Sequence, residues 1–179
     1  MRTICLYCGA RHGADPMYTA AAEELGIALA SRGWRLVYGG GSIGLMGDAA
    51  RAALEHGGEV VGVIPRNLVE REQGLATVTE LVVTETLRER KAIMFERSDA
   101  FVALPGGFGT LEEVLETLTL RQLRYHNKPI YFLNVGAFYE PLFAFFHHVN
   151  RTQFIQPSHF DLFEVCPDVP SLMDRLANI

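Results

Sequence analysis

The amino-acid sequence predicts an α/β fold: a single doubly wound parallel sheet, Rossmann-like, with helices on both faces. The first observation behind this prediction is that apolar runs of strand length alternate with longer amphipathic stretches along the chain. The second is that several short runs are continuously apolar, as in residues 101–104, which is typical of parallel strands covered on both faces. Glycine and proline separate the segments, so right-handed crossovers are expected to connect successive strands.

The elements are expected in a regular order. Short apolar runs predict strands at residues 3–8, 35–38, 59–64, 80–84, 100–104, 129–133 and 162–165. The longer amphipathic stretches predict helices at residues 16–31, 45–56, 87–98, 110–126, 139–150 and 169–177. Ligands of such sheets bind at the carboxyl ends of the strands, so the loops that follow strands are the candidate functional segments.

Length and charge limit the function classes. The 179 residues contain no repeat or linker-like stretch, so residues 1–179 are expected to form one domain. The net charge of −5 argues against a sequence-independent nucleic-acid binder, and nucleic acid is not an expected partner. The apolar fraction of 49% is ordinary, but the mean hydropathy of +0.11 is slightly high. A self-complementary interface using residues 142–146 and the helix after Thr110 would explain this surplus.

The sequence predicts a cytoplasmic protein without a membrane partner. The N-terminus lacks the features of a signal peptide, and the apolar stretch 129–146 is interrupted by Asn134, Gly136, Glu140 and Pro141. The three cysteines do not suggest an oxidising compartment. Cys5 and Cys8 are expected to pack in the core, because side chains three residues apart in a strand point to opposite faces. No metal site is expected, since a structural zinc site needs four ligands.

A first glycine-rich loop, residues 39–47, follows the second predicted strand. It contains Gly-x-Gly-x-x-Gly between a strand and a helix, but the next strand ends in Ile64-Pro65-Arg66 and lacks the acid of a dinucleotide fingerprint. Two interpretations are equally favoured: backbone contact with phosphate or ribose, and a turn that allows tight strand–helix packing. The loop residues that would contact the ligand are Gly40, Gly41, Ser42, Gly44 and Met46.

A second loop, residues 105–113, follows the fifth predicted strand and reads Pro-Gly-Gly-Phe-Gly-Thr-Leu-Glu-Glu. Gly107, Gly109 and the hydroxyl of Thr110 suit an anion pocket at a helix N-terminus. The alternative is that Thr110 and Glu113 form a capping box. The position at the carboxyl end of a strand and the three glycines favour the ligand site.

The helix before this loop carries four cations, Arg88, Arg90, Lys91 and Arg97. A solvated basic face is the simple interpretation. Arg90, Met94 and Arg97 share one stripe of that helix, however, and a guanidinium held there would suit a phosphate or a leaving group. The sequence therefore predicts a local anion-binding site in an acidic protein.

These motifs together resemble the Lonely Guy (LOG) family of cytokinin-activating nucleotide phosphoribohydrolases, whose members are often labelled lysine decarboxylases. The family motif Pro-Gly-Gly-x-Gly-Thr-x-x-Glu is met in full by residues 105–113, and its Arg-Lys-x-x-Met by Arg90, Lys91 and Met94. The first glycine loop, Cys5-x-x-Cys8-Gly9 and the segment containing Gln122, His126 and Lys128 are also similar, so the match runs from the first strand to about residue 150. Many members have Met-His where this chain has Leu87-Arg88, and this difference affects the expected substrate preference more than the expected chemistry.

The resemblance implies hydrolysis of the N-glycosidic bond of a purine or N6-modified (cytokinin) nucleoside 5′-monophosphate, without a cofactor. The implied catalytic residues are Glu113, which would stabilise an oxocarbenium-like transition state or activate water, and Arg90. Glu112 and Glu116 are alternatives to Glu113. The implied substrate-binding residues are Glu72, Arg90, Lys91, Gly107, Phe108, Gly109, Thr110, Leu111, Glu112, Glu113 and Thr119. Family members also imply a homodimer with the site near the subunit interface, and further assembly in some cases.

A carrier and a decarboxylase are the two alternatives to the hydrolase. A nucleotide or molybdenum-cofactor carrier would use the same glycine cradle but would have no evident need for Arg90 with Glu113. A pyridoxal-phosphate decarboxylase would need a Schiff-base lysine, and neither Lys91 nor Lys128 has a recognisable partner for the cofactor ring nearby in the sequence. The hydrolase is therefore favoured over the carrier, and the decarboxylase is rejected.

Overall fold

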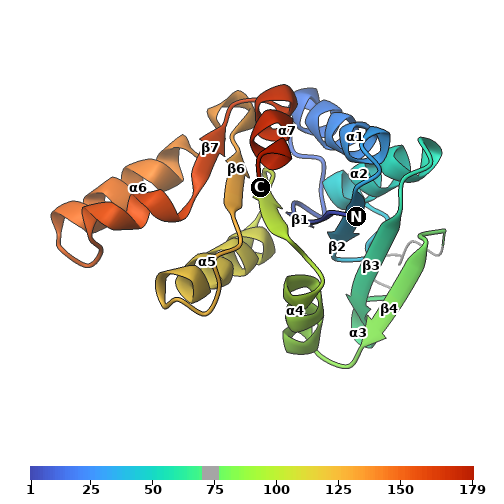
Figure 1. Cartoon of the computed structure of the whole chain (residues 1–179), viewed down its shortest axis with the longest axis horizontal. Coiled ribbons are helices and arrows are strands. Elements are labelled where there is room, and N and C mark those ends of the chain that lie inside the picture. The colour runs from blue at the N-terminus through green and yellow to red at the C-terminus, as the bar shows by residue number, and fades with distance from the viewer. Residues whose placement is uncertain (70–76) are drawn as a thin grey trace.

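In the part of the chain that the structure describes, seven parallel strands form one sheet in the order β4-β3-β2-β1-β5-β6-β7 (Figure 1). The structure is a computed structural model that describes residues 1–69 and 77–179. The strands are β1 (Thr3–Tyr7), β2 (Arg35–Tyr38), β3 (Val60–Pro65), β4 (Glu80–Thr84), β5 (Ala100–Ala103), β6 (Ile130–Leu133) and β7 (Glu164–Cys166). Every neighbouring pair is parallel, so the predicted doubly wound class is confirmed.

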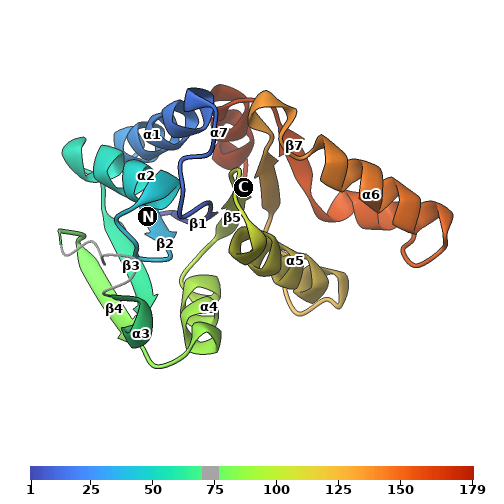
Figure 2. The same cartoon turned by 180° about the vertical axis from the view of Figure 1, so that it is seen from behind.

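Helices cover both faces of the sheet (Figures 1 and 2). One face carries α1 (Pro16–Ser31), α2 (Gly44–Glu55) and α7 (Val169–Ala177). The other face carries α4 (Leu87–Glu96), α5 (Phe108–Gln122) and α6 (Glu140–Arg151). Among the described helices, none is long and apolar enough to span a membrane.

The first strand shows how the sequence builds the two layers. Ile4 and Leu6 pack into the core under α1, α2 and α7, whereas Cys5 and Tyr7 pack into the opposite core against α4 and α5. This alternation is expected for a strand buried on both faces. Cys5 and Cys8 therefore lie in different cores, and both are buried free thiols, as predicted. The described residues contain no cluster of three or more potential metal ligands.

No predicted boundary differs from the observed one by more than four residues. The last strand begins two residues later than predicted, because Leu162 ends a 3-10 helix (Pro157–Leu162) and β7 begins only at Glu164. A second 3-10 helix (Val135–Ala137) and the four-residue α3 (Arg66–Val69) were not predicted. Segments this short show no hydrophobic period, so the sequence pattern could not reveal them.

A crevice is expected between β1 and β5 because the chain changes direction there. β1 pairs with β2 on one side and with β5 on the other. The helix after β1 packs on one face and the helix after β5 on the opposite face, so the two loops diverge at the carboxyl ends of the strands. Ligands of doubly wound sheets bind at such a switch point.

Candidate active site

A cavity of about 500 Å³ lies at this switch point. The loops after β1, β2 and β5 supply its wall, through residues 8–13, Gly39 with Met46, and most of residues 105–110. Arg90 of α4 and Glu113 of α5 line it from one face of the sheet, and Tyr18 and Phe138 from elsewhere in the chain. Its volume is within the range of small-molecule sites.

The second glycine loop leads directly into α5 and leaves the start of this helix uncapped by a side chain. Gly107 is the N-cap residue, and no side-chain cap hydrogen bond is present there. The first N–H groups of a helix have no partner within the helix, so they are available to an anion. A Cβ atom added at Gly107 or Gly109 would meet no atom within 4 Å, whereas one at Gly106 would overlap the side chain of Thr110. Packing within the described chain therefore explains Gly106 but not Gly107 or Gly109.

The capping-box alternative for Thr110 and Glu113 is wrong. The helix begins at Phe108, two residues before the predicted start, so Thr110 is its third residue and not its N-cap. The Glu113 carboxylate instead accepts a hydrogen bond from Arg90. Both side chains are about nine-tenths buried, with exposed fractions of 11% for Arg90 and 8% for Glu113.

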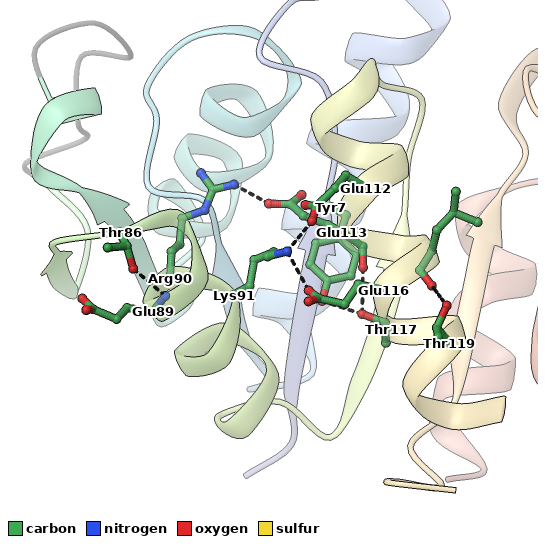
Figure 3. Close-up of polar contacts among 11 residues, drawn as sticks. Tyr7, Thr86, Glu89, Arg90, Lys91, Glu112, Glu113, Glu116, Thr117 and Thr119 are labelled. Carbon is green, nitrogen blue, oxygen red and sulfur yellow. Dashed lines mark hydrogen bonds and ion pairs between the residues drawn. The ribbon is translucent and has the colours of Figure 1, made fainter. Parts of the chain in front are cut away.

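This buried ion pair joins α4 to α5 (Figure 3). Burial raises the pKa of Glu113 to about 7, although the charge and hydrogen bond of Arg90 act to lower it. A carboxyl group with that pKa exchanges a proton near neutral pH, as a general base or acid must. Arg90 Nε is buried and has no hydrogen-bond partner among the described residues, so one donor of the guanidinium is free for a ligand.

Lys91 forms a second set of contacts between the same helices, outside the cavity. Its Nζ donates to Glu112 and lies 2.8 Å from Glu116 Oε2, and Figure 3 shows it between the two carboxylates. Both glutamates are exposed, unlike Glu113. Glu112 and Glu116 therefore do not share the environment of Glu113.

The predicted cluster of four cations on α4 is not formed at the cavity. Only Arg90 lines it. Arg97 Nη1 lies 2.8 Å from Glu80 Oε2. Arg88 and Lys91 line a separate hollow of about 210 Å³ between α4 and α5. The spacing of four cations along one short helix could not show that three of them point elsewhere.

In the first glycine loop, tight packing accounts for some residues and the cavity is lined by others, so each of the two predicted interpretations applies to part of the loop. Gly40 has φ +80°, and an added Cβ would lie 2.9 Å from the Cβ of Ile64 on β3. Gly44 has φ +62°, and an added Cβ would overlap the backbone of Ala10 and Arg11. Tight packing therefore explains these two glycines, while Gly39 and Met46 face the cavity.

Comparison with known proteins identifies the family of the chain. The sequence profile of the family described as "Possible lysine decarboxylase" matches residues 46–176. A probable cytokinin riboside 5'-monophosphate phosphoribohydrolase of Oryza sativa subsp. japonica is 49% identical over 175 residues, which is 98% of this chain and 77% of that protein. The chain belongs to the LOG family. Another member, a cytokinin riboside 5'-monophosphate phosphoribohydrolase of Arabidopsis thaliana, is 43% identical and covers 98% of this chain and 81% of its own length.

A solved structure extends the likeness beyond the LOG family. The molybdenum cofactor carrier protein of Chlamydomonas reinhardtii superposes with a TM-score of 0.76 at 25% identity, covering 99% of this chain and 96% of its own. The two proteins share the doubly wound sheet. The family fold is thus found in proteins described as hydrolases and as a carrier, and the site residues must distinguish them.

The decarboxylase label of the family profile does not fit the cavity. Lys91 and Lys128 are the only lysines in the sequence, and both lie in the described part of the chain. Lys91 is held by Glu112 and Glu116, and Lys128 Nζ donates to the carbonyl oxygen of Phe95 at 2.7 Å. Neither lysine lines the cavity, so a pyridoxal-phosphate Schiff base has no residue to form on there.

The structure brings together part of the predicted LOG site. The predicted residues that line the cavity are Met46, Arg90, Gly107, Gly109, Thr110 and Glu113. The predicted residues that do not line it are Gly40, Gly41, Ser42, Gly44, Lys91, Phe108, Leu111, Glu112 and Thr119. Thr119, for example, bonds to the Leu115 carbonyl oxygen on the exposed side of α5 (Figure 3). Glu72 lies outside the described residues.

The largest omission of the sequence prediction is the loop after β1. Residues 8–13 all line the cavity, yet the sequence analysis placed none of them at the ligand. A signal was present, because this loop follows a predicted strand and contains Gly9 and Gly13. Tyr18 and Phe138 reach the cavity from distant positions and carry no comparable signal.

Proposed function

We propose that the protein hydrolyses the N-glycosidic bond of purine or N6-modified (cytokinin) nucleoside 5′-monophosphates to the free base and ribose 5-phosphate. The observation that carries the proposal is the buried Arg90–Glu113 pair beside the uncapped start of α5. Membership of the LOG family supports the same reaction, because the relatives named above are phosphoribohydrolases.

The start of α5 provides the expected phosphate position. Its free N–H groups and the positive end of the helix dipole favour an anion there. Gly107 and Gly109 leave the backbone open to close approach. Glu113 lies four residues beyond Gly109, or about 6 Å further along the helix axis. A nucleotide with its phosphate at the helix start would thus bring its ribose toward the Glu113 carboxylate.

The reaction needs a carboxylate at the ribose. As the bond between C1′ and the base nitrogen breaks, its electron pair leaves with the base and positive charge develops on the sugar. The ionised Glu113 would stabilise that charge and take a proton from the water whose oxygen attacks C1′. Arg90 keeps its protons, and its free Nε–H would donate a hydrogen bond to the ribose or to the leaving base. The proton that the departing base takes up would be the one that Glu113 removes from the attacking water, so that one water molecule is added across the broken bond.

The test is release of ribose 5-phosphate from AMP and from N6-isopentenyl AMP by the purified protein. We expect Glu113→Gln and Arg90→Ala to reduce turnover by about 10²-fold or more, the usual effect of removing a preorganised charge. Glu55→Gln, on the exposed end of α2, is the matched control and should retain full activity. Circular dichroism of each variant checks that the fold is intact.

One result would favour a carrier instead. The structural likeness to the molybdenum cofactor carrier protein makes binding without turnover the second candidate. A carrier needs the glycine cradle but has no evident need for a buried Arg90–Glu113 pair. Measurable nucleotide binding with no release of ribose 5-phosphate from either substrate would contradict the hydrolase.

We also propose that the protein is a cytoplasmic homodimer. No residue of α6 is buried in the single chain, although this helix contains Leu142, Phe143, Phe145 and Phe146. Phe145 on α6 and Phe154 just after it are 58% and 83% exposed, and Figure 1 shows α6 projecting from the sheet. A second copy of the chain would cover this apolar surface. Sedimentation equilibrium should give twice the chain mass, and a monomer at micromolar concentration would contradict the proposal.

A further inference from the structure

A histidine in the cavity wall is connected to a buried carboxylate that the reaction described above does not use. His12, in the loop after β1, lines the cavity, and its Nε2 lies 3.2 Å from Asp48 Oδ2 on α2. Asp48 Oδ1 accepts a hydrogen bond from Arg51 at 2.7 Å, and Arg51 also donates to the Ser42 carbonyl oxygen at 2.6 Å. The contacts thus run from the cavity into the first glycine loop.

The carboxylate end of this arrangement is deeply buried, and the histidine end is open. The Asp48 side chain is 8% exposed, whereas that of His12 is 59% exposed. Asp48 Oδ2 is buried without a well-aligned hydrogen bond from the described residues. A buried carboxylate oxygen in that state destabilises the fold, so the imidazole N–H at 3.2 Å is the group placed to satisfy it.

Nε2 facing Asp48 leaves the other ring nitrogen of His12 free. A carboxylate that accepts from one imidazole nitrogen fixes the orientation of the ring and leaves Nδ1 for a second partner. The loop of His12 packs against the second glycine loop, since Gly9 N donates to the Pro105 carbonyl oxygen at 3.0 Å. His12 therefore lies in a wall of the cavity continuous with the start of α5.

The charges of the cavity indicate what His12 would bind. Among the described residues, the basic side chains lining it are Arg11, His12 and Arg90, and Arg90 is already paired with Glu113. The start of α5 supplies only about half a unit of positive charge. A phosphate dianion in this cavity thus needs further side-chain donors, and an imidazole with a proton on each ring nitrogen donates to a carboxylate on one side and a phosphate on the other.

We propose that His12 is a phosphate-binding residue that donates Nδ1–H to the 5′-phosphate of the substrate, with Asp48 as its positioning residue. This inference rests on the proposed function, because it concerns the phosphate of the same nucleotide. His12 and the start of α5 would hold the phosphate from two sides, and the Arg90–Glu113 pair would act on the ribose end.

Calorimetric binding of ribose 5-phosphate tests the proposal independently of turnover. We expect His12→Ala to raise its Kd by about tenfold or more, as for loss of a charge-assisted hydrogen bond. Asp48→Asn should weaken binding by a smaller factor, because the imidazole remains but is no longer oriented by a charge. His56→Ala, at the opposite end of α2 from Asp48, is the matched control and should bind as the unaltered protein does.

A phosphate-free ligand separates phosphate binding from a general loss of structure. Adenosine should bind equally to the unaltered protein and to His12→Ala, whereas AMP should lose affinity in the variant. Equal affinities of both proteins for ribose 5-phosphate would overturn the role of His12, and an unchanged Kd in Asp48→Asn would overturn that of Asp48. If ribose 5-phosphate binds through His12 but no base is released from AMP or N6-isopentenyl AMP, the proposed function fails while this inference stands.

Discussion

The two glycine-rich loops contain similar motifs but use glycine for different reasons. In the first loop, Gly40 and Gly44 have positive φ and lie against neighbouring backbone or side chains, so a side chain would clash with the protein itself. In the second loop, Gly107 and Gly109 face open space, and an added Cβ would touch no other part of the described chain. The two loops follow β2 and β5, the strands on either side of β1 in the sheet, and residues of both loops line the same cavity.

The difference separates a requirement of the fold from a requirement of the ligand. A glycine that the packing demands reports on stability, and a glycine that the packing does not demand needs another reason to be there. At Gly107 and Gly109 the reason that we propose is room for an anion beside the first turn of α5. Substitutions should therefore affect folding in the first loop and binding in the second.

The largest expected effect is that of Gly44→Ala on stability. The substitution combines positive φ with overlap against the backbone of Ala10 and Arg11, and backbone cannot move aside as a flexible side chain can. We expect a loss of about 4 kcal/mol or more in the free energy of unfolding. A thermal melt should show a fall in Tm of about 10 °C or more.

Gly33→Ala is the matched control for this prediction. Gly33 also has positive φ, at +66°, but an added Cβ would meet nothing within 4 Å. It therefore isolates the backbone strain, about 1 kcal/mol, from the overlap. Equal Tm values for the two variants would contradict a packing role for Gly44.

The second prediction concerns how the free energy of unfolding changes with pH because of Glu113, which ends the second-loop motif. Glu113 has an ordinary pKa of 4.5 when unfolded and a pKa of about 7 when folded, because burial disfavours its ionised form. Between these values the folded chain keeps a proton that the unfolded chain has released. The free energy of unfolding should therefore fall as the pH rises from about 4.5 to 7, by up to about 1.4 kcal/mol per unit.

Glu113→Gln isolates this contribution from those of other titrating groups. Urea unfolding of both proteins should show the unaltered protein losing stability relative to the variant as the pH rises from 5 to 7, and no further relative change above about 8. A difference that stays constant across this range would show that burial does not raise the pKa of Glu113.

The smallest expected effect on stability is that of Gly109→Ala. Position 109 is the second residue of α5, and alanine is a better helix former than glycine, so Tm should stay the same or rise slightly. The added methyl group would project into open space that the phosphate is expected to occupy. We expect the KM for AMP to rise about tenfold, as for loss of one charge-assisted hydrogen bond. Lower stability with an unchanged KM would remove the distinction between the two loops.

Much of the fold could be predicted because buried parallel strands are continuously apolar in sequence. The run at residues 101–104 and the Gly-Gly-x-Gly that follows it fix both β5 and the start of the site. The family resemblance implied that Arg90 and Glu113 act together, and the structure shows their contact. The sequence could not show which way each side chain points, so Lys91 and Glu112 were placed at the substrate although they pair outside the cavity.

His12 and Asp48 illustrate what sequence spacing cannot predict. They are 36 positions apart in the sequence and belong to different elements. Neither lies in a motif that specifies an ion pair. Their contact depends on how the loop after β1 lies against α2. That packing is known only once α1 and α2 are placed on the same face of the sheet.

The two helices that carry the Arg90–Glu113 pair differ in how many of their residues are buried. Five residues of α5 are buried, and Tyr7 of β1 shares a hydrogen bond with Thr117 one turn beyond Glu113. Only Met94 of α4 is buried. A substrate entering the cavity therefore meets a carboxylate on a helix with five buried residues and a guanidinium on a helix with one. We expect bases of different size to be accommodated on the arginine side of the site.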